Sequence, residues 1–188
     1  MMKIRSLNYW EVFAVVFSFI SVVLTIKVHI GQWAFGIVGV VFYFIVFYRA
    51  KLYANMWLQV MFIALQIYGW YEWLRGGEGN SELPISHSPL TLNLVLLMVA
   101  IIGIIFMNLY FIKFTDNARP LADSAATVLS LIAQWMLAKK YIENWVVWVL
   151  VNLIVIFLGV KQKLYLTAGL YLLFLILAII GYLEWLKA

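Results

Sequence analysis

Charged residues are scarce in this chain, and their scarcity excludes a soluble globular fold. Of its 188 residues only 11% are charged, whereas 66% are hydrophobic. A soluble domain has about a quarter of its residues charged, because its surface must be solvated by water. So few charges cannot form such a surface, and most of the chain must therefore face lipid.

Cysteine is absent altogether, which excludes a disulfide framework and any metal site built from thiolates. The two histidines, His29 and His87, are far apart and have no metal-ligand spacing around them, so no metal or cofactor is expected. The chain also lacks a GxxxxGK[ST] loop, so it encodes no ATP-driven step. No Ser-His-Asp arrangement stands out, and the sequence does not indicate an enzyme.

Long apolar runs take the place of the missing charge. In a bilayer only helices and closed barrels pair all their backbone groups, and barrel strands alternate apolar and polar residues. The run "TLNLVLLMVAIIGIIFMNLYFI" is apolar in solid blocks, so we predict an all-α integral membrane protein. About 20 apolar residues cross the hydrocarbon core. Seven transmembrane helices are predicted, at 9–27, 33–48, 53–74, 91–113, 121–139, 145–160 and 164–186.

Basic residues lie in the breaks between these spans. A net charge of +5 in such a chain is typical of loop lysines that set topology, and nucleic-acid binding is not expected. The N-terminal side of the predicted topology receives eight Lys and Arg and the other side five, which favours a cytoplasmic N-terminus. No small-residue cleavage site follows the first apolar run, so we expect that run to be a retained helix.

The chain matches itself when it is shifted by 112 positions. Trp33 falls on Trp145, "KLY" at 51–53 falls on "KLY" at 163–165, and "GWYEWL" at 69–74 falls on "GYLEWL" at 181–186. Coincident Trp, Gly, Lys and Glu residues are hard to attribute to chance in a leucine-rich chain. We interpret the match as an internal repeat.

The repeat predicts a 3+1+3 architecture. Residues 1–76 form the first three-helix repeat, 77–119 a loop with a linker helix, and 120–188 the second repeat. Three spans are an odd number, so two repeats joined directly would have opposite orientations in the membrane. The linker helix crosses once more and makes the two repeats parallel. Transporters are often built in this way, with the substrate bound between the repeats at mid-bilayer. The alternative is an old duplication in a scaffold that does not transport.

Polar side chains inside the predicted spans are candidate substrate ligands, because such groups are costly at membrane depth. Gln59, Gln134 and Asn152 lie inside spans. Trp145, Trp148 and Asn152 share one helix face, where two indoles and an amide could stack a ring and hydrogen-bond its substituent. The alternative is a helix–helix hydrogen bond with tryptophans at the interface, and this is the reading preferred for Gln66.

The stretch "QIYGWYEWLRGG" gathers aromatic side chains at a span end. Trp73, and Trp185 at the equivalent place, are predicted to lie in the aromatic belt at the membrane interface. Tyr68 and Trp70 lie deeper and are candidates for the substrate pathway. Glu72 could pair with a cationic ligand or serve the helix end.

These residues carry a family resemblance. "LYANMWLQVMFIALQIYGWYEW" at 52–73 and "DSAATVLSLIAQWMLAKKYIENWVVWVLVN" at 123–152 resemble the PnuC family of bacterial vitamin transporters, over nearly the whole chain. Its recurring signatures are "LQ…YGWY.W" and "ENW..W...N". The resemblance implies seven core helices in a 3+1+3 plan, like the SWEET sugar carriers.

The resemblance implies facilitated diffusion of an unphosphorylated B-vitamin precursor across the bacterial inner membrane, with nicotinamide riboside as the first expectation. A cytoplasmic kinase would then trap the substrate by phosphorylation. Carried over by position, Gln59 and the segment 68–73 occupy one signature, and Trp145, Trp148 and Asn152 the other. The resemblance leaves homo-oligomer formation open.

Gly39 departs from the family pattern, because many relatives have an asparagine there, within "G.INV". The lost amide keeps thiamine open as an alternative substrate, for which Glu72 would matter. Riboflavin is carried by other relatives. A membrane enzyme or a helper subunit is the alternative from a different class.

Overall fold

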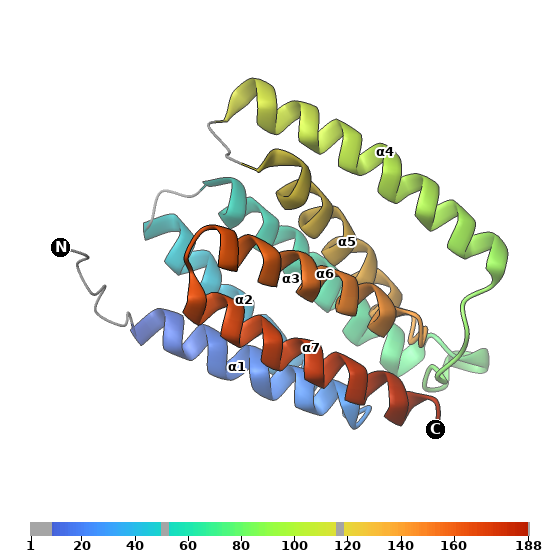
Figure 1. Cartoon of the computed structure of the whole chain (residues 1–188). Coiled ribbons are helices and arrows are strands. Elements are labelled where there is room, and N and C mark those ends of the chain that lie inside the picture. Colours follow the sequence, from blue (N-terminus) through green and yellow to red (C-terminus); the bar gives the residue numbers. More distant parts are fainter. Residues whose placement is uncertain (1–8, 50–52, 116–118, 188) are drawn as a thin grey trace. The chain divides into compact units, whose positions relative to one another are not determined.

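The structure is a computed structural model that describes residues 9–49, 53–115 and 119–187. All of its long elements are helices (Figure 1). In chain order they are α1 (Tyr9–Ile26), α2 (Gln32–Arg49), α3 (Tyr53–Arg75), α4 (Leu90–Phe114), α5 (Pro120–Ala138), α6 (Asn144–Lys161) and α7 (Tyr165–Trp185), with a short 3-10 turn η1 (Glu78–Asn80) after α3.

The seven predicted spans match these helices, with ends that differ by no more than two residues. Six of the helices are long and apolar enough to cross a membrane: α1, α2, α4, α5, α6 and α7. Helix α3 has 23 residues and a length of about 34 Å, which suffices to span, but it is the most polar of the seven. Its polar character comes from residues such as Gln59, Gln66 and Glu72.

The chain divides into two compact units, Met1–Glu82 and Leu83–Ala188. In the first unit α2 contacts both α1 and α3, and in the second α4 contacts α5, α5 contacts α6, and α6 contacts α7. Within the described part of each unit, long helices contact only their neighbours in the chain. Helix α2 in the first unit and helices α5 and α6 in the second are therefore the ones packed on two sides.

The turn between the first two helices of each repeat has the same backbone in both units. Val28 and Lys140 each adopt a left-handed conformation, with φ of 53° and 52°. The amide N–H of Val28 donates to the Thr25 carbonyl and that of Lys140 to the Leu137 carbonyl, both at 2.9 Å. Residues 112 positions apart thus have the same backbone conformation. This holds even for Val28, although a β-branched residue is costly at positive φ.

The same offset recurs in a Trp–Gly–Trp packing arrangement. The rings of Trp33 and Trp73 meet edge to face at 5.3 Å and 85°, and those of Trp145 and Trp185 at 5.5 Å and 88°. Such T-shaped pairs are favoured by the ring quadrupole. The first tryptophan of each pair, on α2 or α6, lies directly against a glycine of the following helix, Gly69 on α3 or Gly181 on α7.

The interface-belt prediction for Trp73 and Trp185 is wrong. Their side chains are only 2% and 1% exposed, because each inserts its ring against the partner tryptophan inside its own unit. The neighbouring Trp70 and Tyr71 are 37% and 59% exposed. The helix turns these two outward, so they are the belt candidates of this segment.

Replacing Gly181 with alanine tests this packing. An added Cβ at Gly181 would lie 2.6 Å from the Trp145 ring, so the tryptophan pair must shift. We expect Gly181→Ala to lower the free energy of unfolding by about 1–3 kcal/mol, measured by thermal unfolding in detergent.

Gly169 on the same helix is the matched control. An added Cβ there meets no atom within 4 Å, so Gly169→Ala should be neutral or stabilising by up to about 1 kcal/mol. Equal destabilisation by both substitutions would contradict the packing role of Gly181.

Candidate functional site

Two buried amides on adjacent helices of the second unit have no hydrogen-bond partner among the described residues. Gln134 on α5 is 8% exposed and Asn152 on α6 is 4% exposed. Neither is among the fully buried polar atoms that lack a partner in the described chain, which belong to other side chains. Trp148 lies one turn before Asn152 on α6 and is half-buried. These three side chains stay the candidate ligand groups of this unit.

The structure separates Trp145 from the other members of its predicted face. Trp145 is 3% exposed, and its ring lies against Gly181 and Trp185. Its indole N–H is buried without a hydrogen-bond partner in the described chain. Packing therefore occupies the Trp145 ring, and the half-buried Trp148 and the buried Asn152 are left as the ligand candidates of the "ENW..W...N" signature.

The predicted residues on α3 lie in different surroundings. Gln59 is 8% exposed, and its amide makes one long contact, 3.5 Å, to the Asn55 carbonyl. Tyr68 is half-buried, and Trp70 is 37% exposed. Glu72 lies in the last turn of α3, where its carbonyl accepts the Gly76 N–H at 2.7 Å. An added Cβ at Gly76 would lie 2.5 Å from Glu72 Oε2, so the Glu72 side chain lies against the residue that follows α3, which favours the helix-end reading of Glu72 over the ligand reading.

A buried polar cluster in the first unit was not predicted from the sequence. The Ser21 hydroxyl on α1 donates to the Gln32 carbonyl at 2.8 Å, and the Thr25 hydroxyl lies 3.2 Å from Gln32 Oε1. The spacing of Ser21 and Thr25 by one helical turn was the available signal. The cluster ties α1 to the start of α2 and fixes the turn between them.

Glycines of α2 allow the helices of the first unit to approach closely. An added Cβ at Gly39 would lie 2.9 Å from Ser18 Oγ on α1, so an asparagine could not fit there without moving α1. At Gly36 the added atom would collide with Gln66 Oε1, which is buried without a hydrogen-bond partner in the described chain. The hydrogen bond expected of Gln66 is therefore not made by this oxygen.

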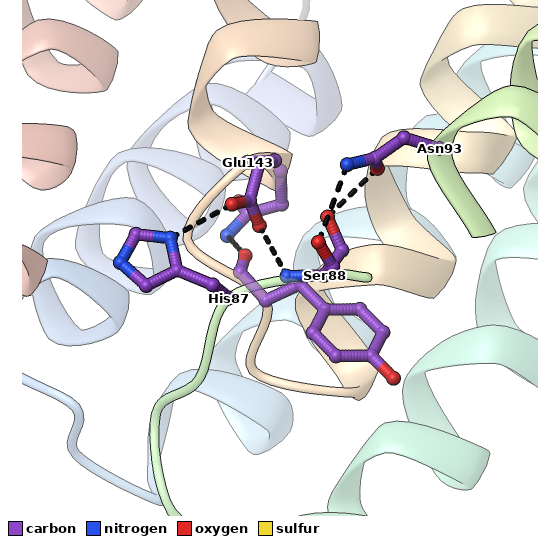
Figure 2. Close-up of polar contacts among 6 residues, drawn as sticks. His87, Ser88, Asn93 and Glu143 are labelled. Carbon is purple, nitrogen blue, oxygen red and sulfur yellow. Dashed lines mark hydrogen bonds and ion pairs between the residues drawn. The ribbon is translucent and has the colours of Figure 1, made fainter. Parts of the chain in front are cut away.

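A network of polar contacts holds the segment before α4 against the turn between α5 and α6 (Figure 2). One carboxylate oxygen of Glu143 accepts the Ser88 N–H at 2.9 Å, and the other lies 2.9 Å from His87 Nδ1. The Ser88 hydroxyl in turn contacts Asn93 Oδ1 at 2.7 Å. Sequence reasoning missed this network, since its partners lie 55 and 56 positions apart.

Glu143 is held ionised by these contacts. Burial raises its pKa, but the hydrogen bonds from the Ser88 backbone and the His87 ring outweigh burial and leave the pKa below the ordinary 4.5. Hydrogen bonds to the charged form have this effect. Among the residues that the structure describes, no three His, Asp or Glu side chains lie together in a way that could hold a metal ion.

Known proteins are similar to this chain in both sequence and fold. Residues 8–187 match the model of a family described as nicotinamide mononucleotide transporters. The chain belongs to this family. It is therefore a multi-pass membrane transporter of a small molecule, and the resemblance predicted from its two signatures is confirmed.

Individual relatives agree with the family assignment. The chain is 32% identical over 184 residues to the nicotinamide riboside transporter PnuC of Escherichia coli, an alignment that covers 85% of this chain and 77% of the relative. It is 28% identical over 187 residues to the PnuC protein of Neisseria mucosa, covering 93% and 70%. A crystal structure of the vitamin B3 transporter PnuC matches the fold with a TM-score of 0.78 at 23% identity, covering 97% of this chain and 83% of that one.

The lowered pKa of Glu143 predicts a pH dependence of stability. Because the folded-state pKa lies below 4.5, the carboxylate stabilises the fold above about pH 4.5, and this stabilisation is lost as the pH falls through the lowered pKa. His87 faces the carboxylate, and Lys139 and Lys140 lie in the same turn.

The comparison is with Glu143→Gln, which cannot titrate. We expect the wild-type chain to have the higher melting temperature between pH 6 and 7, and the difference to shrink as the pH falls below about 4.5. A difference that stays constant down to pH 3 would contradict an ionised Glu143 in the folded state.

Proposed function

We propose that the chain is a uniporter that carries nicotinamide riboside by facilitated diffusion across the bacterial inner membrane. The single observation that supports this most is the burial of two amides on the adjacent helices α5 and α6, Gln134 and Asn152, the second of which lies one turn after the half-buried Trp148. The relatives named for nicotinamide riboside supply the identity of the substrate.

The chemistry of the riboside complements these three side chains. Its nicotinamide ring is flat and cationic, so an indole face attracts it by stacking and by the cation–π interaction. Its carboxamide has one acceptor and two donors, as do the amides of Asn152 and Gln134. Bound riboside would therefore satisfy polar groups that the described chain leaves unpaired.

The family description names the mononucleotide, whereas the relatives are named for the riboside, and the distribution of cations favours the riboside. The phosphate of the mononucleotide would need a cationic partner in a low-dielectric site. The Lys and Arg residues of the described helices lie in their last turns: Arg49, Arg75, Lys113 and Lys161. The helix interiors thus offer a phosphate no cation.

The remaining predicted site residues have secondary roles in this proposal. Gln59, Tyr68 and Trp70 of α3 line the substrate's path in the first unit, and Trp145 fixes the helix that carries Trp148. Glu72 serves the end of α3. Gly39 replaces the asparagine of many relatives, and this lost amide kept thiamine open. The close contact with Ser18 gives glycine a packing reason at this position. The glycine is therefore no argument for thiamine, and riboside is preferred.

Uniport requires a separate trap for the substrate. A cytoplasmic riboside kinase would provide it, because the phosphorylated product carries a charge that the transporter does not accept. The chain itself would perform no chemistry. The excess of Lys and Arg on the N-terminal side supports a cytoplasmic N-terminus, and assembly as a homo-oligomer is compatible with this function.

Proteoliposomes containing the purified chain test the function. Labelled nicotinamide riboside should equilibrate across the membrane without a pH gradient or ATP, and it should accumulate only when a riboside kinase and ATP are enclosed. Unlabelled riboside should compete, whereas the mononucleotide and thiamine should not. Competition by thiamine alone would move the proposal to the alternative substrate, and binding without any flux would favour a helper subunit.

Two substitutions test the site residues. Asn152→Leu keeps the side-chain volume but removes both hydrogen-bonding groups, so we expect affinity for the riboside to fall about tenfold to a hundredfold. Trp148→Ala removes the stacking surface and should lower the affinity by a similar factor. Equilibrium binding to the detergent-solubilised chain measures both.

Leu150 on the same helix is the control, because it is 48% exposed and apolar. Leu150→Ala should leave the affinity unchanged. Normal affinity in Asn152→Leu and Trp148→Ala would exclude these residues from the site.

A further inference from the structure

The segment 83–89, here named the strap, is fastened to the turn between α5 and α6 along its length. The Ser86 N–H donates to the Lys140 carbonyl at 3.1 Å, and the Ile142 N–H donates back to the Ser86 carbonyl at 3.0 Å. Lys140 Nζ donates to the Leu83 carbonyl at 2.7 Å. Glu143 completes the attachment through Ser88 and His87, as Figure 2 shows.

The attachment continues into both flanking helices. On one side, Ser88 contacts Asn93 in the first turn of α4 through two hydrogen bonds of 2.7 and 3.3 Å. On the other side, Glu143 immediately precedes α6. A single carboxylate therefore joins the start of α4, through Ser88, to the start of α6.

The first unit shows that the turn itself does not need this carboxylate. Its equivalent turn between α1 and α2 has the same hydrogen bonds, including Gln32 N–H to the His29 carbonyl and Trp33 N–H to the Ile30 carbonyl. Gly31 occupies the position equivalent to Glu143. The local backbone forms without an acid at that position, so the role of Glu143 lies in its long-range contacts with the strap.

Fixing the start of α6 also fixes the proposed substrate groups on that helix. Along a rigid helix with a rise of 1.5 Å per residue, Trp148 lies about 8 Å and Asn152 about 14 Å from Glu143. Both Asn144 and Trp145, the first residues of α6, are buried, at 0% and 3% exposure. A rotation at this end would therefore change the directions in which the Trp148 and Asn152 side chains point.

We propose that Glu143 is a positioning residue for transport, which fastens the strap to the start of α6 and so fixes Trp148 and Asn152 for substrate binding. This inference rests on the proposed function. Glu143 does not contact the substrate; it acts through α6.

The first test compares three variants for riboside affinity and for hydrogen exchange of the strap. Glu143→Ala removes both hydrogen bonds, and we expect affinity to fall about fivefold to tenfold with faster exchange at 85–88. Glu143→Gln keeps an oxygen that can accept the Ser88 N–H, so its loss should be smaller. Glu184→Ala is the control, because it breaks an exposed ion pair with Lys187 at 2.7 Å and should change neither readout.

The second test restores the attachment in another way. Ser86 and Tyr141 are bridge partners, and neighbouring extended segments lie about 4.8 Å apart, within the span of a disulfide. The chain has no other cysteine, so Ser86→Cys and Tyr141→Cys can be paired cleanly in the Glu143→Ala background. Oxidation should restore the affinity for riboside, and reduction should lower it again to the level of Glu143→Ala.

The outcomes separate the inference from the function on which it rests. Faster strap exchange with unchanged affinity in Glu143→Ala, or no recovery on oxidation, would overturn the positioning role. If Glu143→Ala does not fold, Glu143→Gln is compared with the wild-type chain instead. A Glu143→Gln variant with the riboside affinity and the strap exchange of the wild-type chain would overturn the inference. Failure of the wild-type chain to bind riboside at all, with strap exchange still controlled by Glu143, would instead refute the proposed function.

Discussion

The lack of water in the bilayer core is the constraint on which the rest of this structure depends. It requires each spanning segment to be a helix, because only a helix satisfies its own backbone groups within the segment. It also makes every buried polar side chain costly unless that side chain has a partner. In the first unit Ser21 and Thr25 hydrogen-bond to Gln32, while Gln32 Nε2 and Gln66 Oε1 lack a partner in the described chain. In the second unit the structure shows no hydrogen bond for the Gln134 and Asn152 side chains among the described residues, and we propose these two amides as ligand groups.

The two units show how one repeat serves two purposes. Their turns and their Trp–Gly–Trp packing agree residue by residue, which identifies these features as the structural requirements of the repeat. The positions that differ are the informative ones. Val40 in the first unit corresponds to Asn152 in the second, and Gly31 corresponds to Glu143. The second unit therefore carries both the unpartnered amide on α6 and the carboxylate that fastens the strap, whereas the first carries neither.

Hydrophobic length was sufficient to predict every helix, because the breaks between spans are polar and the spans themselves are almost free of charge. Side-chain direction was harder to predict. Trp73 and Trp185 have the sequence context of interface residues, yet both are buried. One turn before each of them a glycine, Gly69 or Gly181, leaves room for the ring of the partner tryptophan. This packing joins two helices and could not be seen in the sequence of one helix. Trp145 was expected to share a substrate face with Trp148 and Asn152, but its ring packs against Gly181 and Trp185. The Glu143 network could not be predicted, because it joins residues that are distant in the chain. The parallel, SWEET-like arrangement of the repeats stays a prediction.

A structure of the chain with nicotinamide riboside bound tests the central claim most directly. The account predicts the carboxamide of the riboside within hydrogen-bonding distance of the Asn152 amide, with the nicotinamide ring against the Trp148 indole. A riboside bound elsewhere, with the Asn152 and Gln134 amides hydrogen-bonded to other protein groups, would contradict it.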